Sequence, residues 1–157
     1  MLLQSGHYIV ERLKARCPEA AGRVLTTADL AGVAEAAQIA PALHVVLLDY
    51  MPAETTPGGS VRWDETWCVV ALVRHAARQD RAAAQAASAC PLLNAAVRAL
   101  AGYRYRIVGD AWGKLAIVPG PRPYLDEAFA YFPFAVRAAC VTQGTGGDLV
   151  KGARHGA

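Results

Sequence analysis

The chain has 157 residues and a mass of 16.6 kDa, which is enough for one domain with a hydrophobic core. Apolar residues make up 54% of the chain, which excludes general disorder. The stretch 82–101 is half alanine and is interrupted by polar residues, so it is too weakly apolar for a membrane-spanning helix. The net charge of +3 is spread along the chain, which permits contact with nucleic acid without predicting it. The N-terminus has no basic leader before an apolar run, so we expect no secretion signal and synthesis as a cytoplasmic protein.

The first forty residues predict two helices. Ser5 can cap a helix over residues 5–17, whose apolar stripe recurs at helical spacing and which Pro18 ends. Thr27 precedes an alanine-rich stretch that predicts a second, shorter helix over residues 28–38. We expect both helices to pack on a sheet formed by the segments that follow.

Two strands are expected next, joined by a loop. The β-branched run 44–48 predicts a short strand buried on both faces and closed by the turn-forming residues 49–52. Residues 53–60 are rich in Pro, Gly and Thr, and they predict a loop. Residues 61–74 alternate strictly, and only their second half is apolar on both faces, so this strand should begin exposed and end in the core.

The middle of the chain predicts a loop at residues 75–79 and then two consecutive helices. Asp80 is a plausible cap for an alanine-rich helix, and Pro91 suits the first turn of a new one. Gly102 should end the second helix. No role is evident for the alanine run 82–89.

The last third reads as strands separated by turn residues, expected at residues 103–108, 114–118 and 131–141. Strands close enough to form hairpins, with helices at the start and in the middle, predict a single α+β domain over residues 1–142. Its antiparallel or mixed sheet should carry the helices on one face. Residues 143–157 are rich in Gly and poor in apolar groups, and they predict a flexible C-terminal tail.

The cysteines offer little chemistry. None of the four has a spacing typical of a zinc site or a disulfide framework, so we expect buried free thiols at Cys17, Cys68, Cys90 and Cys140. A nucleophile and base would have to combine one of the last three with His7, His44 or His75. The apolar surroundings of these thiols should raise their pKa, which opposes that chemistry.

Two other candidate sites are weak. Asp64 and Glu65 are adjacent in a strand, point to opposite faces and cannot form a catalytic pair, so we expect surface ion-pair partners. The glycine-rich segment 144–147 lacks the context of a phosphate-binding loop.

A basic and aromatic alternation in the strand at 103–108 could stack on single-stranded nucleic acid. We favour a solvated sheet face for Tyr103, Arg104, Tyr105 and Arg106 because the net charge is small. The sequence therefore predicts no enzyme, no cofactor and no metal.

Several short motifs follow one another in a recognisable order between residues 5 and 141. They are the N-terminal helix with its proline turn, Arg23-Val24-Leu25, the strand with Trp67, the helix end Leu100-Ala101-Gly102-Tyr103 and the strand Tyr131-Phe132-Pro133-Phe134-Ala135-Val136. In order and spacing they resemble the bacteriophage tail terminator (tail completion) proteins.

That resemblance implies an α+β structural protein of the virion, assembled in the bacterial host cytoplasm, with no catalysis and no membrane. Such proteins form a ring, generally a hexamer, on the head-proximal end of the tail tube. The ring ends tube polymerisation and offers a surface for the head-tail connector protein. The implied partners are thus further copies of this chain, the tail tube protein and the connector, with genomic DNA passing through the ring without sequence-specific binding.

The same helices and sheet would also suit a small cytoplasmic ligand-binding or regulatory domain. A cysteine hydrolase is the third class considered. Neighbouring genes for tail tube, tape-measure and connector proteins would favour the terminator.

The expected docking surface is the loop after residue 52 together with the exposed start of the following strand. A projecting loop beside an aromatic residue and charges of both signs suits contact with a neighbouring subunit or the tube, with Trp63 as an apolar anchor. An ordinary hairpin loop with Trp63 packed on its own sheet fits the pattern equally well. The candidate interface residues are Thr55, Thr56, Arg62, Trp63, Asp64, Glu65, Arg74 and Arg78.

Overall fold

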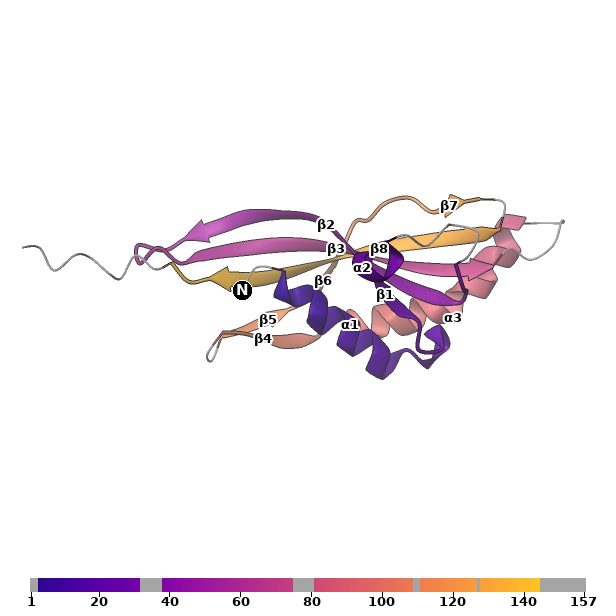
Figure 1. Cartoon of the computed structure of the whole chain (residues 1–157), viewed down its shortest axis with the longest axis horizontal. Coiled ribbons are helices and arrows are strands. Elements are labelled where there is room, and N and C mark those ends of the chain that lie inside the picture. Colours follow the sequence, from indigo (N-terminus) through magenta and orange to yellow (C-terminus); the bar gives the residue numbers. More distant parts are fainter. Residues whose placement is uncertain (1–2, 32–37, 75–80, 109–110, 127, 145–157) are drawn as a thin grey trace, which may run out of the picture.

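A computed structural model describes residues 3–31, 38–74, 81–108, 111–126 and 128–144. It has one mixed sheet in the order β1-β2-β3-β8-β6, with β7 also paired to β8 and with β4 and β5 forming a separate hairpin. Helices α1 and α3 cover one face of the sheet, as Figure 1 shows. The predicted α+β class is confirmed. The elements are α1 (Gln4–Arg16), the 3₁₀ turn η1 (Pro18–Ala20), β1 (Val24–Thr26), α2 (Thr27–Leu30), β2 (Ala42–Thr55), β3 (Val61–Arg74), α3 (Arg81–Leu100), β4 (Arg104–Val108), β5 (Ala111–Lys114), β6 (Ala116–Val118), β7 (Tyr124–Leu125) and β8 (Phe129–Thr142).

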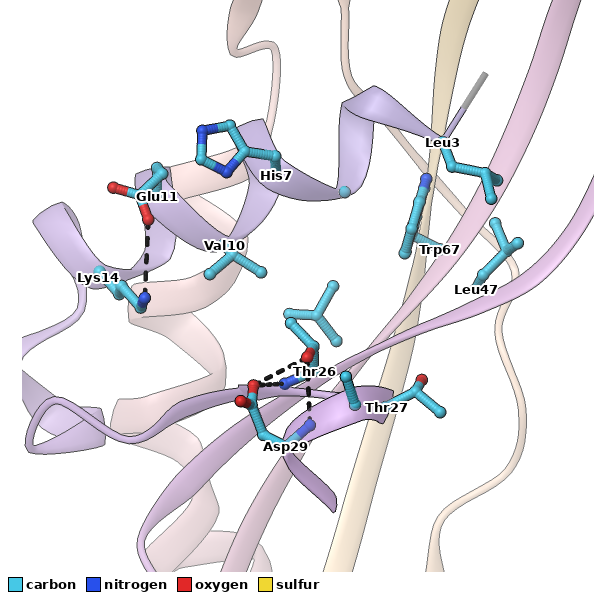
Figure 2. Close-up of a pocket in the computed structure, with 13 residues that line it drawn as sticks. Leu3, His7, Val10, Glu11, Lys14, Thr26, Thr27, Asp29, Leu47 and Trp67 are labelled. Carbon is cyan, nitrogen blue, oxygen red and sulfur yellow. Dashed lines mark hydrogen bonds and ion pairs between the residues drawn. The ribbon is translucent and has the colours of Figure 1, made fainter. Parts of the chain in front are cut away.

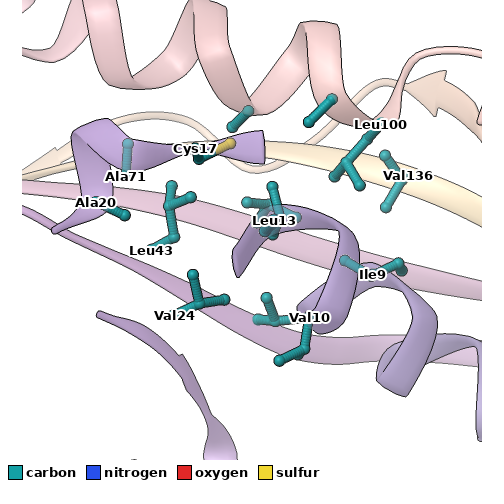
Figure 3. Close-up of a cluster of buried hydrophobic side chains, with 14 of the residues drawn as sticks. Ile9, Val10, Leu13, Cys17, Ala20, Val24, Leu43, Ala71, Leu100 and Val136 are labelled. Carbon is teal, nitrogen blue, oxygen red and sulfur yellow. The ribbon is translucent and has the colours of Figure 1, made fainter. Parts of the chain in front are cut away.

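The core lies between the two long helices and the sheet (Figure 3). Ile9 and Leu13 of α1 and Leu100 of α3 are fully buried against Leu43 of β2 and Val136 of β8. Burying a side chain of this size stabilises the fold by about 1.5–3 kcal/mol. Within the described residues, no helix is long and apolar enough to cross a membrane.

The first helix lies where it was expected, but Ser5 does not cap it. The helix begins at Gln4 after Leu3, which takes a left-handed conformation (φ 65°) and provides no side-chain cap. Ser5 lies inside the helix and donates a hydrogen bond to Glu65 of β3 instead. The prediction of Ser5 as the cap is wrong because this hydroxyl has a tertiary partner that the local sequence does not reveal.

The predicted second helix is much shorter than expected. Helix α2 has four residues and starts after Thr26, whose side chain accepts the N–H of Asp29 while Asp29 accepts the N–H of Thr26. Ala31 returns to an extended conformation and ends the helix. The rest of the expected helix lies outside the described residues, except Gln38, which is not helical. Strand β1, which lies parallel to β2, was not predicted.

Strand β2 is 14 residues long and does not end at residues 49–52 as predicted. Strands β3 and β8, of the same length, pair with each other along their whole extent, and β2 continues alongside them. Register shifts after Leu47 and Pro52 absorb the irregular residues, and a proline is tolerated because β2 is an edge strand there. The predicted loop 53–60 shrinks to a turn at residues 56–60.

Strand β3 matches its predicted span, and its predicted change from a more exposed start to a buried end is confirmed in outline. Residues 48–55, 61–66 and 137–142 of β2, β3 and β8 form a three-stranded ribbon that we call the arm. In Figure 1 the arm extends beyond the N-terminal end of α1. The sheet therefore continues past the helices that cover the rest of it.

Helix α3 is continuous from Arg81 to Leu100, so the prediction that Pro91 starts a new helix is wrong. Proline removes one backbone donor, but the helix continues because both sides of Pro91 bury apolar residues, including Ala89 and Leu92. Gly102 ends the helix at φ 69°, as predicted. The expected loop 75–79 and the cap at Asp80 lie outside the described residues.

The strand predicted at 114–118 is two strands. Leu115 separates β5 from β6 because its side chain is buried and its backbone bonds to Gly102 and Tyr103. Strand β4 matches the predicted 103–108 to within one residue, and β8 is slightly longer than expected. Strand β7 was not predicted. Of the predicted tail, residues 145–157 lie outside the described residues, so its flexibility stays a prediction.

Candidate interaction surfaces

A buried carboxylate lies where the arm meets α1. Glu65 is fully buried, so its prediction as a surface ion-pair partner is wrong. Its carboxylate accepts hydrogen bonds from Ser5 Oγ, the backbone N–H of Leu3, Trp67 Nε1 (3.1 Å) and Cys140 Sγ (3.0 Å). Trp67 Nε1 also donates to Ser5 Oγ at 2.8 Å. These bonds join the start of α1 to β3 and β8.

The alternation of β3 contained a signal for this cluster. Glu65 lies on the same face as Trp67 and Val69, and that face meets the helices. Trp67 is half-buried, and its ring lies directly over Gly6 of α1, where no Cβ has room. Trp67 therefore packs against the N-terminal part of α1.

The cysteines are not arranged as nucleophiles. Cys17, Cys68 and Cys140 are buried, whereas Cys90 is exposed, which corrects its prediction as a buried thiol. Burial raises the pKa of Cys17 to about 11, and burial together with the Glu65 carboxylate raises that of Cys140 to about 12.

Cys68 and His44 lie on neighbouring strands, and burial favours the neutral form of both side chains. Cys68 pairs with Val46 and His44 with Val70, so Cys68 and His44 share one face of neighbouring strands. Burial raises the pKa of Cys68 and lowers that of His44, which opposes a thiolate and imidazolium pair. His7 is exposed on α1, and His75 lies outside the described residues.

These thiols predict a simple reactivity pattern. At pH 8, iodoacetamide should modify Cys90 rapidly and leave Cys17, Cys68 and Cys140 unmodified until the protein unfolds, because the thiolate is the nucleophile.

The raised pKa values also predict how stability depends on pH. The thiols of the unfolded chain have a pKa of 9.0, so above this pH the unfolded chain loses protons that the folded chain retains. The free energy of unfolding should therefore fall toward pH 11–12. Mass spectrometry of the native protein, with Cys90→Ser as the control, checks the first result, and urea titrations between pH 8 and pH 11 check the second. Rapid native labelling of Cys140 would contradict this pattern.

The basic and aromatic strand does not present a stacking surface. Tyr105 is buried, its hydroxyl donates to the carbonyl of Ala139 at 2.6 Å, and burial raises its pKa. Tyr103 is half-buried under the guanidinium of Arg12, 4.5 Å from its ring centroid. The favoured solvated face therefore holds for the exposed side chains of Arg104 and Arg106 and is wrong for the tyrosines.

Most of the predicted docking residues lie on the arm. Thr55 and Thr56 are exposed beside the terminal turn, and Arg62 pairs with Asp64 at 3.7 Å. Trp63 is half-buried and lies 6.0 Å from Tyr50 between ring centroids. Five of the eight predicted residues thus lie together on the arm and its terminal turn, with side chains that are not fully buried.

The remaining three are not part of this group, although Glu65 lies on the arm. Arg74 is at the opposite end of β3, where its guanidinium lies 5.4 Å from the ring centroid of Phe129. Glu65 is buried as described, and Arg78 lies outside the described residues.

A groove of about 560 Å³ opens between α1 and the β1–α2 segment. Figure 2 shows Leu47 and Trp67 on its sheet side, with Glu11 and Lys14, an ion pair at 3.6 Å, along α1. This is where a small-molecule-binding domain would place its ligand. Among the described residues, no group of three or more His, Cys, Asp or Glu side chains could hold a metal ion.

The two edges of the sheet differ in charge. Strand β1 pairs with β2 only as far as Val45, and no other described strand pairs with that edge of β2. The uncovered part, the β2 edge, has three exposed apolar side chains and two acidic ones: Leu48 (47% exposed), Tyr50 (48%), Met51 (56%), Asp49 and Glu54.

On the other side of the sheet, β6 is outermost. At this edge, which we call the β6 edge, Ile117 of β6 is 42% exposed. Two exposed cations adjoin Ala116 of β6: Lys114 of β5 and Arg137 of β8. The two cations line a groove of about 390 Å³ together with Arg62, Asp64, Ala116 and Ala139. Exposed apolar side chains beside charges suit contact with another protein.

Comparison with known proteins identifies a family. The family model described as "phage tail terminator protein" matches residues 3–142, which is most of the chain and ends where β8 ends. No match to a curated protein was found.

Proposed function

Because the chain belongs to the phage tail terminator family, we propose that it forms a closed ring, a hexamer, on the head-proximal end of the tail tube. Membership makes it a structural component of the virion tail that associates with other tail or head proteins. In our proposal the ring stops addition of tube subunits and presents a surface to the head-tail connector protein. DNA passes through it without sequence-specific contact. Assembly takes place in the host cytoplasm.

The observation that supports this role best is the arm. It extends the sheet beyond the helices and leaves the β2 edge unpaired by any described strand from Val46 to Thr55. An open edge with exposed apolar side chains is a template for contact with another chain. A terminator needs such a surface, because it must bind subunits that do not continue the tube.

The test is tail length and ring formation. In a phage that lacks this gene, tails should be abnormally long and unjoined to heads, and supplying the protein should restore tails of normal length. The purified protein should form rings with a central hole in negative-stain images, alone or on tube ends. A strict monomer that also fails to bind tube protein would overturn the proposal and favour a ligand-binding domain that uses the groove beside α1.

We expect the arm to be needed for assembly. Trp63→Ala, or deletion of residues 54–59, should impair ring formation or tube capping, because Trp63 and Tyr50 shape the surface near the end of the arm. The far-UV spectrum and the cooperative melt should remain largely unchanged, because both changes lie outside the main core. Light scattering and tail-length measurements check this. Normal rings and tails in both variants would show that the end of the arm is not an interface.

A further inference from the structure

We propose that, within the ring, the β2 edge of one subunit packs against the β6 edge of the next. This inference rests on the proposed function, and it names the two surfaces that meet. The partner of each edge is thus a second copy of this chain.

Both edges leave apolar side chains exposed. Leu48, Tyr50 and Met51 follow one another closely on the β2 edge, and Ile117 is exposed on β6 itself. Aromatic residues and methionine are enriched at protein interfaces, where burial removes them from water. Each edge therefore offers apolar surface that another protein chain can cover, more of it on the β2 edge.

The charges of the two edges are opposite. Asp49 and Glu54 of the β2 edge form no ion pair with any described residue, and neither do Lys114 and Arg137 of the β6 edge. The described acidic group nearest these two cations in their groove is Asp64, and Asp64 is already paired with Arg62. Contact between one β2 edge and another β6 edge would bring these unpaired charges of opposite sign together.

The sheet register places the charges on one face. Asp49 pairs with Thr66, Thr66 pairs with Arg137, and Arg137 pairs with Ala116 of β6. Residues paired directly across neighbouring strands point to the same face, so Asp49 and Arg137 lie in one row at opposite sides of the sheet. If copies stand side by side in one orientation, the acidic end of each row faces the basic end of the next.

The contact is heterologous, because two different surfaces meet. A heterologous contact leaves both complementary surfaces available at the ends of any open chain of subunits, and repeated rotation closes it into a ring. A contact of one edge with its own copy would instead stop at a dimer and would bring like charges together. The asymmetry of the edges thus favours a ring over a dimer.

Two charge-reversed variants test the inference. The first is Asp49→Lys with Glu54→Lys, and the second is Lys114→Glu with Arg137→Glu. All four side chains are exposed, so each variant should fold, which circular dichroism and thermal melting check. Each variant alone brings like charges together at every contact, so the concentration needed for rings or capped tubes should rise by at least about tenfold.

An equimolar mixture of the two variants should restore assembly. In an alternating ring, the reversed β2 edge of the first variant meets the reversed β6 edge of the second, and the remaining contacts are native. Native mass spectrometry should find equal numbers of both variants in each ring. Glu19→Lys, which reverses an exposed charge in η1 on neither edge, is the control that should assemble like the natural protein.

The outcomes separate the two proposals. If the natural protein forms rings and both variants also do so normally, or if the mixture does not restore assembly, the edge contact is wrong and the proposed function stands. If rings form normally but tube capping is lost, the edges bind another protein, which also overturns the inference. If the natural protein neither forms rings nor caps tubes, the proposed function fails and the inference fails with it.

Discussion

Replacing Glu65 with alanine should lower the free energy of unfolding by about 3–5 kcal/mol. The carboxylate is fully buried and accepts bonds from Ser5 Oγ, the N–H of Leu3 and the Trp67 indole. Its removal deprives the buried Ser5 hydroxyl and the Leu3 N–H of their acceptor and leaves Trp67 Nε1 with Ser5 Oγ alone. Bonds to a charged acceptor are worth more than neutral ones, and each buried donor left unsatisfied costs about 1–3 kcal/mol. Urea denaturation followed by tryptophan fluorescence measures the loss.

Two further variants separate the lost bonds from a general effect of changing β3. Glu65→Gln keeps the shape and one acceptor oxygen, so it should cost less than Glu65→Ala. Asp64→Ala lies on the opposite face of the same strand and removes only a partly exposed ion pair with Arg62, so it should change stability by about 0–1 kcal/mol. Equal effects of Glu65→Ala and Asp64→Ala would show that the buried cluster does not hold α1 to the arm.

Gly6→Ala should destabilise the protein by about 1–3 kcal/mol. At an exposed position inside a helix, replacing Gly with Ala stabilises the protein by about 0.5–1 kcal/mol. A loss of stability here would therefore have the opposite sign to the effect of helix propensity alone. A Cβ at Gly6 would lie 2.3 Å from Cη2 and 2.7 Å from Cζ2 of Trp67. The indole cannot move away without losing its bonds to Ser5 and Glu65.

The displacement of Trp67 gives a second signal. Its fluorescence should shift in the folded Gly6→Ala protein, because the ring leaves its contact with α1. Gly58→Ala adds the same methyl group at a turn where only Thr56 Oγ1 lies within 4 Å, at 3.9 Å. That variant should leave both stability and fluorescence almost unchanged. A stabilised Gly6→Ala protein would mean that α1 does not approach β3 as closely as described.

The buried contacts of Glu65 and of Gly6 with Trp67 also bear on assembly. Glu65, Gly6 and Trp67 join α1 to the root of the arm, whereas the arm beyond them has no described helix over it. Losing the cluster should therefore affect the arm's orientation as well as the stability of the core. The surfaces that we propose for assembly depend in this way on buried residues that do not touch a partner.

The sequence by itself determined the features that depend on local pattern. Alternation located β3 to the residue, and the apolar spacing of α1 and Gly102 at the end of α3 were read correctly because they reflect strand geometry, helix periodicity and a positive φ angle. The α+β class followed from the order of such segments. The family resemblance likewise depended on the order of short motifs along the chain, and the family match confirmed it.

Only the tertiary structure decided the features that depend on partners distant in sequence. Strand β2 continues past residues 49–52 because β3 lies beside it, and α3 continues through Pro91 because its apolar side is buried. Glu65 is buried although its sequence neighbours are charged or polar, because donors from α1, sixty residues away, satisfy its carboxylate. Opposite charges at the two sides of the sheet became visible only once the strand order was known. Pairing and burial between segments far apart in the chain compensate local preferences that would otherwise end a strand, break a helix or expose a charge.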